Sequence, residues 1–120
     1  MSDVKVAIID HGFSNSKSVQ NMLSWIGIQS QITYDPVEID NASHLILPGV
    51  GSFDAAMKSM FERGLVEILN TQVLNKKKPL LGICLGMQML LEGSEEGDCE
   101  GLGWLQGVAV KLKYDDKHFK

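Results

Sequence analysis

The chain has 120 residues, of which 44% are hydrophobic and 22% charged, and its formal net charge is -4. This length suits one domain, and the composition is that of an ordinary globular protein, without an apolar run near the ~20 residues of a membrane span. The negative charge gives no general attraction to nucleic acid or to an anionic membrane, so we expect neither as a partner.

The compartment can be predicted from the start of the chain and from its cysteines. The first residues lead directly into an apolar segment and lack the basic region and long apolar core of a signal peptide, which predicts a cytoplasmic protein. A reducing compartment argues against a disulfide between Cys84 and Cys99. We expect Cys99 to be a surface loop residue.

The first strand is expected over residues 4–9, which are mostly apolar and end at Asp10. A helix follows, and its apolar residues repeat at the spacing of one helix face: Val19, Met22, Leu23 and Ile26. Ser14 or Asn15 can cap the start of this helix, and Gly27 stands where a left-handed C-terminal residue is expected. Residues 28–34 alternate in polarity and predict a second strand, nearer the sheet edge.

A short polar connection leads to a third strand, residues 44–47, which runs into the glycine-containing loop 48–51. A helix is expected from about Ser52, with Met57, Met60 and Phe61 on one face, and Gly64 ends it. A second helix continues with Val66, Leu69 and Val73. Strands and helices alternate without hairpin signals, which is the pattern of a parallel sheet with right-handed crossovers.

Residues 80–88 are expected to form a buried strand that turns sharply at Cys84 and becomes a helix, with a helical run over residues 87–91. Such an elbow strains the backbone of the residue at the turn, and Gly82 and Gly86 are small enough for strand and helix to pass closely. The sulfur would then lie at a helix N-terminus, which favours the thiolate. The alternative is that Cys84 is a small core residue, but a plain core strand does not need the flanking glycines.

Three loops should meet at the carboxyl ends of the parallel strands, where ligands bind in such sheets. They are the loop that begins at Asp10, the loop 48–51 and the Cys84 elbow. Backbone amides beside a thiolate can stabilise the oxyanion of a tetrahedral intermediate. We expect these donors to be the amides of Leu85 and of Val50 or Gly51, although a tight turn is the alternative interpretation of loop 48–51.

Four segments of the sequence carry a resemblance to a known family. They are Pro48-Gly49-Val50-Gly51-Ser52-Phe53, Gly82-Ile83-Cys84-Leu85-Gly86-Met87-Gln88, Ser94-Glu95-Glu96-Gly97 and Gly101-Leu102-Gly103-Trp104. On these motifs the whole chain resembles a class I, triad-type glutamine amidotransferase, and within that class the glutaminase subunit of imidazole glycerol phosphate synthase in histidine biosynthesis. The resemblance implies an α/β doubly wound, mainly parallel sheet, flavodoxin-like in strand order. Residues 1–120 would form the N-terminal part of a single such domain, incomplete at the C-terminus.

By this resemblance, Cys84 is the nucleophile that attacks the side-chain amide of glutamine, giving a glutamyl thioester and free ammonia. The ammonia would pass to a synthase (cyclase) subunit as heterodimer partner. The positions that contact or hold substrate in the family are matched here by Gly49, Gly51, Leu85, Gln88 and Glu96. A helix-surface amide and a solvated acidic loop are the alternative interpretations of Gln88 and Glu96. We expect no cofactor and no metal.

The chain departs from the family in two places. The histidine and glutamate of the family's triad lie in a downstream His-Pro-Glu segment, which none of His11, His44 and His118 matches. We therefore expect an N-terminal piece or truncated product that is inactive alone and prone to self-associate. The first loop usually reads Asp-Tyr-Gly-x-Gly-Asn in the family and here reads Asp10-His11-Gly12-Phe13-Ser14-Asn15, which bears on the choice of partner.

Several alternatives to this function remain open from the sequence. A paralogous amidotransferase with the same motifs could supply ammonia for surface-sugar biosynthesis. A hydrolase with a cysteine elbow, or a cysteine-dependent stress protein of similar topology, would belong to a different class of protein. A catalytically silent binding module is the non-enzymatic alternative.

Overall fold

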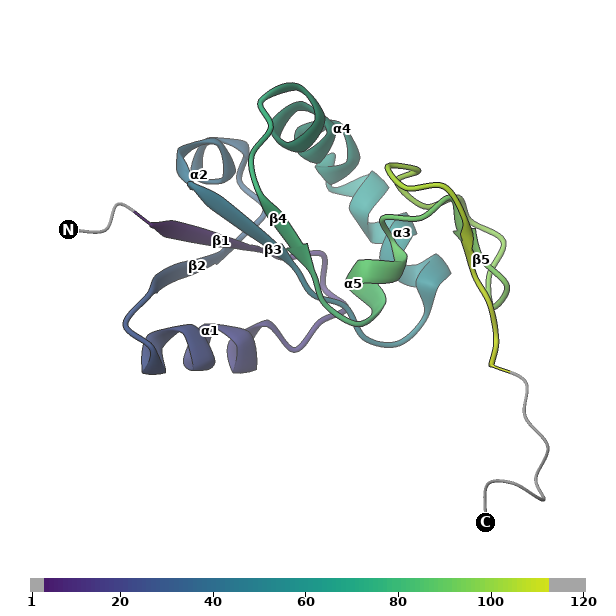
Figure 1. Ribbon diagram of the computed structural model, residues 1–120, viewed down its shortest axis with the longest axis horizontal. Helices are drawn as coiled ribbons and strands as arrows, with labels where there is room; N and C mark the ends of the chain where they lie inside the picture. The colour runs from purple at the N-terminus through teal and green to yellow at the C-terminus, as the bar shows by residue number, and fades with distance from the viewer. Residues whose placement is uncertain (1–3, 113–120) are drawn as a thin grey trace, which may run out of the picture.

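Four parallel strands form the sheet at the centre of the molecule (Figure 1). The computed structural model describes residues 4–112, and the strand order across the sheet is β2-β1-β3-β4. The strands are β1 (Lys5–Ile9), β2 (Gln29–Thr33), β3 (His44–Leu47) and β4 (Leu80–Gly82). This order matches the first four strands of a flavodoxin-like sheet, so the predicted fold class and the edge position of β2 are confirmed.

Helices cover both faces of the sheet (Figure 1). One face is covered by α1 (Ser16–Trp25), and the other by α2 (Pro36–Asn41), α3 (Phe53–Glu62), α4 (Leu65–Leu69) and the π-helical turn η1 (Asn70–Asn75). The short helix α5 (Leu85–Gln88) follows β4, and a small parallel pair, β5 (Gly93–Ser94) and β6 (Val108–Ala109), lies beyond it. Both faces are therefore layered with helices, as the predicted crossovers require.

Successive side chains of β1 point to opposite faces and build two cores. Val6 and Ile8 pack with Leu23 of α1, whereas Ala7 and Ile9 belong to a larger cluster on the other face. That larger cluster buries residues from α2, α3, α4 and α5: Ile39, Phe53, Ala56, Met57, Met60, Leu65, Leu69 and Leu85. Burial on both faces explains why the strand is a continuous apolar run rather than an alternating one.

The predicted boundaries of the first helices are largely confirmed. Ser52 caps α3, and its hydroxyl accepts a hydrogen bond from the Ala55 amide at 3.2 Å. Gly27 and Gly64 have φ of +81° and +71°, so both supply the left-handed conformation that ends or separates helices. Asn15 occupies the N-cap position of α1, but its side chain makes no capping hydrogen bond.

Two predicted helix faces are confirmed only in part, because the strip of each helix that packs in the core is narrower than its set of apolar residues. Met22 and Ile26 of the first helix segment are exposed, and Leu23 is the buried apolar residue of α1. Phe61 is 76% exposed although Met57 and Met60 are buried as expected. Apolar spacing alone does not say how much of a helix face a sheet can cover.

The polar connection expected after β2 is instead the helix α2. The Asp35 side chain accepts a hydrogen bond from the Val37 amide at 3.0 Å, and Pro36 occupies the first turn, where its missing N–H costs nothing. Ile39 is fully buried and ties this short helix to the core. Six residues give too few helical repeats for a periodicity argument.

The strand and helix around the elbow are shorter and less buried than expected. Leu81 of β4 is 58% exposed, because β4 pairs with β3 alone within residues 4–112 and no described helix covers that side chain. The helix α5 ends at Gln88 rather than continuing to residue 91. The Leu90 and Leu91 amides donate to the carbonyls three residues earlier, at Met87 and Gln88, so the α-helical pattern of bonds four residues apart is lost there. Near the end of the described residues, β6 spans only Val108–Ala109.

Candidate active site

Cys84 lies on the turn between β4 and α5, at the position where the sequence predicts an elbow. Its φ of +54° is positive, and its side chain is exposed. A non-glycine residue in such a conformation costs about 1–3 kcal/mol and is retained only where its surroundings enforce it. The Ile83 amide donates to Leu47 at 3.0 Å, and the Cys84 carbonyl accepts from the Met87 amide at 3.0 Å, so both sides of the turn are held.

Close approach of backbone explains the glycines on either side of Cys84. A Cβ at Gly82 would lie 2.8 Å from the Met87 Cα, where strand and helix pass each other. A Cβ at Gly86 would collide with the Leu47 carbonyl, its distance to that carbonyl carbon being 2.6 Å. Only glycine fits either position without displacement of backbone, and the thiol is thereby presented above the end of the sheet.

Loop 48–51 packs directly against this elbow. A Cβ at Gly49 would lie 2.8 Å from the Gly86 amide nitrogen, so the two backbones are in contact. The Leu85 amide donates to the Gly49 carbonyl at 3.2 Å, and the Val50 amide donates to the Phe13 carbonyl at 2.8 Å. The Gly51 amide makes no hydrogen bond within residues 4–112. Of the three amides expected as oxyanion donors, two therefore have protein acceptors in this conformation.

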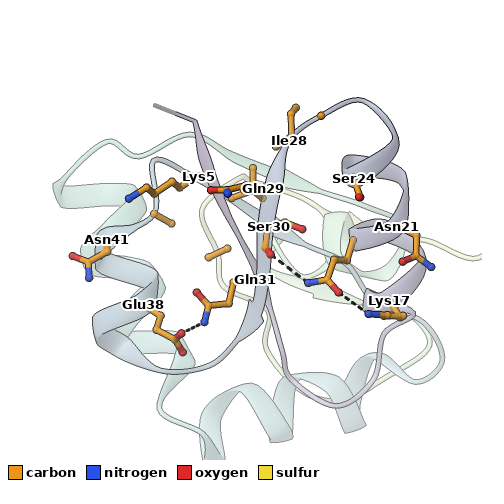
Figure 2. A pocket seen from close by; sticks show the side chains of 15 residues that line it. Lys5, Lys17, Asn21, Ser24, Ile28, Gln29, Ser30, Gln31, Glu38 and Asn41 are labelled. Atoms are coloured by element: carbon orange, nitrogen blue, oxygen red, sulfur yellow. Dashed lines mark hydrogen bonds between the residues drawn. The ribbon is translucent and has the colours of Figure 1, made fainter. Parts of the chain in front are cut away.

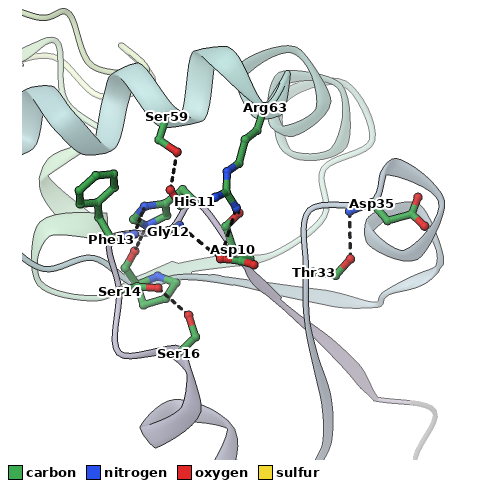
Figure 3. Close-up of polar contacts among 11 residues, drawn as sticks. Asp10, His11, Gly12, Phe13, Ser14, Ser16, Thr33, Asp35, Ser59 and Arg63 are labelled. Atoms are coloured by element: carbon green, nitrogen blue, oxygen red, sulfur yellow. Dashed lines mark hydrogen bonds and ion pairs between the residues drawn. The ribbon is translucent and has the colours of Figure 1, made fainter.

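His11 is a buried support for this loop that sequence reasoning did not find (Figure 3). Its Nε2–H donates to the Pro48 carbonyl at 2.6 Å, and its Nδ1 accepts from the Phe13 amide at 3.4 Å. These two bonds require the neutral ring with the proton on Nε2. Desolvation by burial lowers the pKa of His11, which favours the same neutral form of the ring. The His11 side chain therefore lies inside the loop structure and not on the surface.

The first loop is also tied to α3. Arg63 donates to the Asp10 carbonyl at 3.0 Å and forms an ion pair with the Asp10 carboxylate at 3.5 Å. Its guanidinium lies over the Tyr34 ring, 4.7 Å from the centroid, and the Ser59 hydroxyl donates to the His11 carbonyl. Figure 3 shows the side chains of Ser59, on α3, and of Arg63, directly after α3, pointing toward this loop. The first loop and loop 48–51 therefore form one hydrogen-bonded unit beside the elbow.

The two residues expected to hold substrate lie on separate segments. Gln88 is half-buried on α5, one helical turn after Cys84, and Glu96 is exposed in the loop that follows β5. The Glu96 amide donates to the Ser94 hydroxyl at 3.2 Å. Within residues 4–112 no hydrogen bond joins the side chains of Gln88, Glu96 and Cys84. The sequence motifs predict both residues, and the structure places Gln88 on α5 and Glu96 in the separate loop after β5.

No histidine or carboxylate of the described residues is hydrogen-bonded to the Cys84 thiol. His44 begins β3, and because the strands are parallel it lies at the end of the sheet opposite the elbow. His11 uses both ring nitrogens in the contacts described above. His118 lies outside the described residues. A general base for Cys84 is thus not supplied by residues 4–112.

Two hollows of the surface do not include Cys84. One of about 1010 Å³ follows the outer edge of β2, between α1 and α2 (Figure 2). Lys17, Gln20 and the Ser30 carbonyl are joined there by hydrogen bonds, as are Gln31 and Glu38. The other, of about 560 Å³, is lined by residues that include Tyr34 and Arg63. Neither is lined by a cysteine, so the chemistry is assigned to the elbow rather than to the larger hollow.

Within residues 4–112, no three histidine, cysteine or acidic side chains are grouped so that they could hold a metal ion. None of the helices in the same range has the length and apolar character needed to cross a membrane.

Comparisons with known proteins point to one family. A family model described as glutamine amidotransferase class-I matches residues 7–115. The chain is 51% identical over 112 residues to "Imidazole glycerol phosphate synthase subunit HisH 2" of Methanococcus maripaludis, covering 93% of this chain and 55% of that protein. It is 40% identical over 114 residues to "Imidazole glycerol phosphate synthase subunit HisH" of Leptospira borgpetersenii, covering 95% of this chain and 56% of that protein.

A solved structure supports the fold independently of close sequence similarity. The protein titled "Crystal structure of glutamine amidotransferase" aligns with a TM-score of 0.71 at 19% identity, over 88% of this chain and 55% of that one. The chain therefore spans about half the length of the relatives it matches.

Proposed function

This chain belongs to the class I glutamine amidotransferase family, and from that premise we propose that it carries the nucleophile half of a glutaminase site in a subunit of imidazole glycerol phosphate synthase. The proposal includes hydrolysis of glutamine and delivery of the ammonia to a synthase (cyclase) subunit in histidine biosynthesis. The observation that carries it is the positive φ of Cys84 on a strand-to-helix turn, enforced by the contact of Gly86 with Leu47. A core cysteine would have no use for that strain.

The chemistry follows from the groups around Cys84. The thiolate attacks the side-chain amide carbon of glutamine, and the carbonyl oxygen becomes an oxyanion. Collapse of this intermediate breaks the C–N bond, the nitrogen leaves as ammonia after protonation, and a glutamyl thioester remains. Water then attacks the thioester, releasing glutamate and the Cys84 thiol. Overall, one glutamine and one water give one glutamate and one ammonia.

The remaining residues have proposed roles in binding and charge stabilisation. The amides of Leu85 and of Val50 or Gly51 would donate to the oxyanion once loop 48–51 has turned its carbonyl away from Leu85. Gly49, Gly51, Gln88 and Glu96 would contact or hold the glutamine, the Glu96 carboxylate being suited to an ammonium group. Proton transfer to the leaving nitrogen requires a base that residues 4–112 do not place at Cys84.

The partner and compartment belong to the same proposal. Relatives from two organisms carry the name of a synthase subunit, and we propose the same heterodimeric assembly for this protein. His11 is buried in the first loop, whereas Phe13 of the same loop is exposed and available for contact with a partner. Two free thiols suit a cytoplasmic location.

Glutamine turnover by the full-length protein, with and without its synthase partner, tests the proposal. We expect glutamate and ammonia in equal amounts, and a loss of at least about 1,000-fold in Cys84→Ser, because the weaker hydroxyl nucleophile lacks a base strong enough to activate it. Undiminished turnover in Cys84→Ser, or none in the unaltered protein with its partner, would reject it.

A further inference from the structure

The loop that carries Glu96 is held on its two sides by different anchors. On the N-terminal side, β5 pairs with β6, and the Glu95 amide donates to the Ala109 carbonyl at 2.8 Å. On the C-terminal side, the Asp98 and Cys99 amides donate to the two carboxylate oxygens of Asp54, both at 2.8 Å. Asp54 is therefore the second support of the segment that bears Glu96.

The contact between Asp54 and this loop is close as well as bonded. A Cβ at Gly97 would lie 2.8 Å from the Asp54 Cγ, so the residue directly after Glu96 rests on the carboxylate. The Cys99 thiol lies 3.9 Å from the Asp54 carbonyl oxygen. The two amide hydrogen bonds, from Asp98 first and then Cys99, hold the pKa of Asp54 below its ordinary value. A carboxylate that is ionised at neutral pH makes the stronger, charge-assisted type of hydrogen bond.

Asp54 is itself mounted on a rigid element. It lies in the first turn of α3, between the buried side chains of Phe53 and Ala56, and Ser52 caps that helix. Loop 48–51 ends where α3 begins. One short segment therefore contacts the Cys84 elbow through Gly49 and the Glu96 loop through Asp54.

We propose that Asp54 is a positioning residue of the glutamine site, which sets the place of Glu96 relative to Cys84 by clamping the backbone of residues 98 and 99. This rests on the proposed function, since it assigns Glu96 a role in holding glutamine. Asp54 itself touches no reacting atom. It removes the freedom that an exposed loop would otherwise have, and a substrate-holding carboxylate needs such pre-organisation.

Steady-state kinetics of glutamine hydrolysis on the full-length protein provide the first test. Asp54→Ala loses both acceptors, and we expect KM for glutamine to rise about 10-fold while kcat changes less than about 2-fold, because uniform binding is lost rather than transition-state stabilisation. Asp54→Asn keeps one acceptor oxygen and should give an intermediate KM. Glu100→Gln is the control, an exposed carboxylate beside Cys99 without a hydrogen bond in the described residues.

A double-variant cycle shows whether Asp54 acts through Glu96. In a Glu96→Ala background, Asp54→Ala should raise KM by less than about 2-fold, since the group that it positions is already absent. Amide exchange at Asp98 and Cys99 should accelerate by about 10-fold in Asp54→Ala, which reports the clamp without reference to activity. Melting curves identify any variant that fails to fold, in which case Asp54→Asn carries the comparison.

The outcomes separate this inference from the proposed function. An unchanged KM in Asp54→Ala, or equal effects with and without Glu96, overturns the positioning role while leaving the glutaminase assignment intact. Unchanged exchange at Asp98 and Cys99 overturns the clamp. Absence of glutamine turnover in the unaltered protein overturns the proposed function and, with it, the role of Asp54 in holding substrate.

Discussion

The Leu85 amide donates a hydrogen bond to the Gly49 carbonyl at 3.2 Å. This contact places a carbonyl oxygen, with its partial negative charge, beside the amide that is proposed to stabilise an oxyanion. The Leu85 amide cannot donate fully to both oxygens, so the proposed oxyanion role requires loop 48–51 to turn before acylation. The Val50 amide, bonded to Phe13, is committed in the same conformation.

The occupied Leu85 and Val50 amides predict that Cys84 reacts readily with an alkylating agent but slowly with glutamine in this conformation. Iodoacetamide alkylates a thiolate by displacement at carbon without an oxyanion, whereas acylation by glutamine needs the donors. We expect Cys84 to alkylate within minutes, while thioester formation without the synthase partner is at least about 100-fold slower than with it, a typical cost of one missing oxyanion donor. Mass spectrometry of both adducts measures the two rates. Equal acylation with and without the partner would show that the donors are already free.

The two cysteines should differ in reactivity. Burial first, and then the Asp54 carboxylate, raise the pKa of the Cys99 thiol, whereas Cys84 is exposed. A raised pKa lowers the thiolate fraction at neutral pH, so Cys84 should alkylate about 10-fold faster than Cys99 near pH 7. Asp54→Asn should speed Cys99 and leave Cys84 unchanged. Residue-resolved alkylation between pH 6 and 9 is the measurement, and faster labelling of Cys99 would contradict the assignment of the elbow.

Substitution of Gly86 tests the close packing behind Cys84. Gly86→Ala places a Cβ against the Leu47 carbonyl and 3.0 Å from the Pro48 carbonyl carbon, so either strand or elbow has to move. We expect a loss of about 3 kcal/mol or more in the free energy of unfolding. Gly93→Ala is the matched control, because its nearest neighbour, the Cys99 carbonyl oxygen, is 3.9 Å away. Urea unfolding of both variants decides the point, and similar losses would argue against a tight elbow.

The buried His11 predicts an acid-sensitive fold. Its pKa is lowered in the folded state, so the unfolded chain binds more protons as pH falls below the ordinary histidine value of about 6.5. Stability should therefore be complete above about pH 6.5 and should decline as the pH falls toward and through the folded-state pKa. The charges of Asp10 and Arg63 also act on that pKa, Asp10 raising it and Arg63 lowering it, so neither residue is changed in the variants that test the prediction.

His11→Gln removes the titrating ring and should flatten the stability profile between pH 7 and 5 relative to the unaltered chain. His44→Gln is the control, since His44 is exposed and should leave the slope unchanged. The measurement is the urea midpoint at several pH values. Parallel profiles for the chain and for His11→Gln would show that His11 does not couple protons to folding.

The outer edge of β4 predicts self-association of the 120-residue chain. Within residues 4–112 this edge has no strand partner, and Leu81 is exposed there. Unpaired edges and apolar side chains favour association between chains. We expect concentration-dependent sedimentation at micromolar levels, weakened about 10-fold by Leu81→Glu but not by Phe61→Glu, an equally polar change on the exposed side of α3. A stable monomer at these concentrations would refute the prediction.

The sequence by itself determined the fold class and the position of the elbow. Continuous apolar runs in residues 6–9 and 45–47 specify parallel strands buried on both faces, since alternation would expose half of their side chains. Gly82 and Gly86 around Cys84 specify a crossing of strand and helix, because close backbone approach excludes any side chain. These features are local, so spacing and residue type are sufficient to reveal them.

Only the tertiary structure decided which donors are occupied and which residues support the site. His11 bonds to the Pro48 carbonyl, 37 residues away in the sequence. Asp54 accepts from the Asp98 and Cys99 amides, which are 44 and 45 residues away. The exposure of Phe61 and Leu81 depends equally on what the neighbouring elements cover. Contacts at such separation arise from the packing of the sheet and helices, which no local pattern of residues encodes.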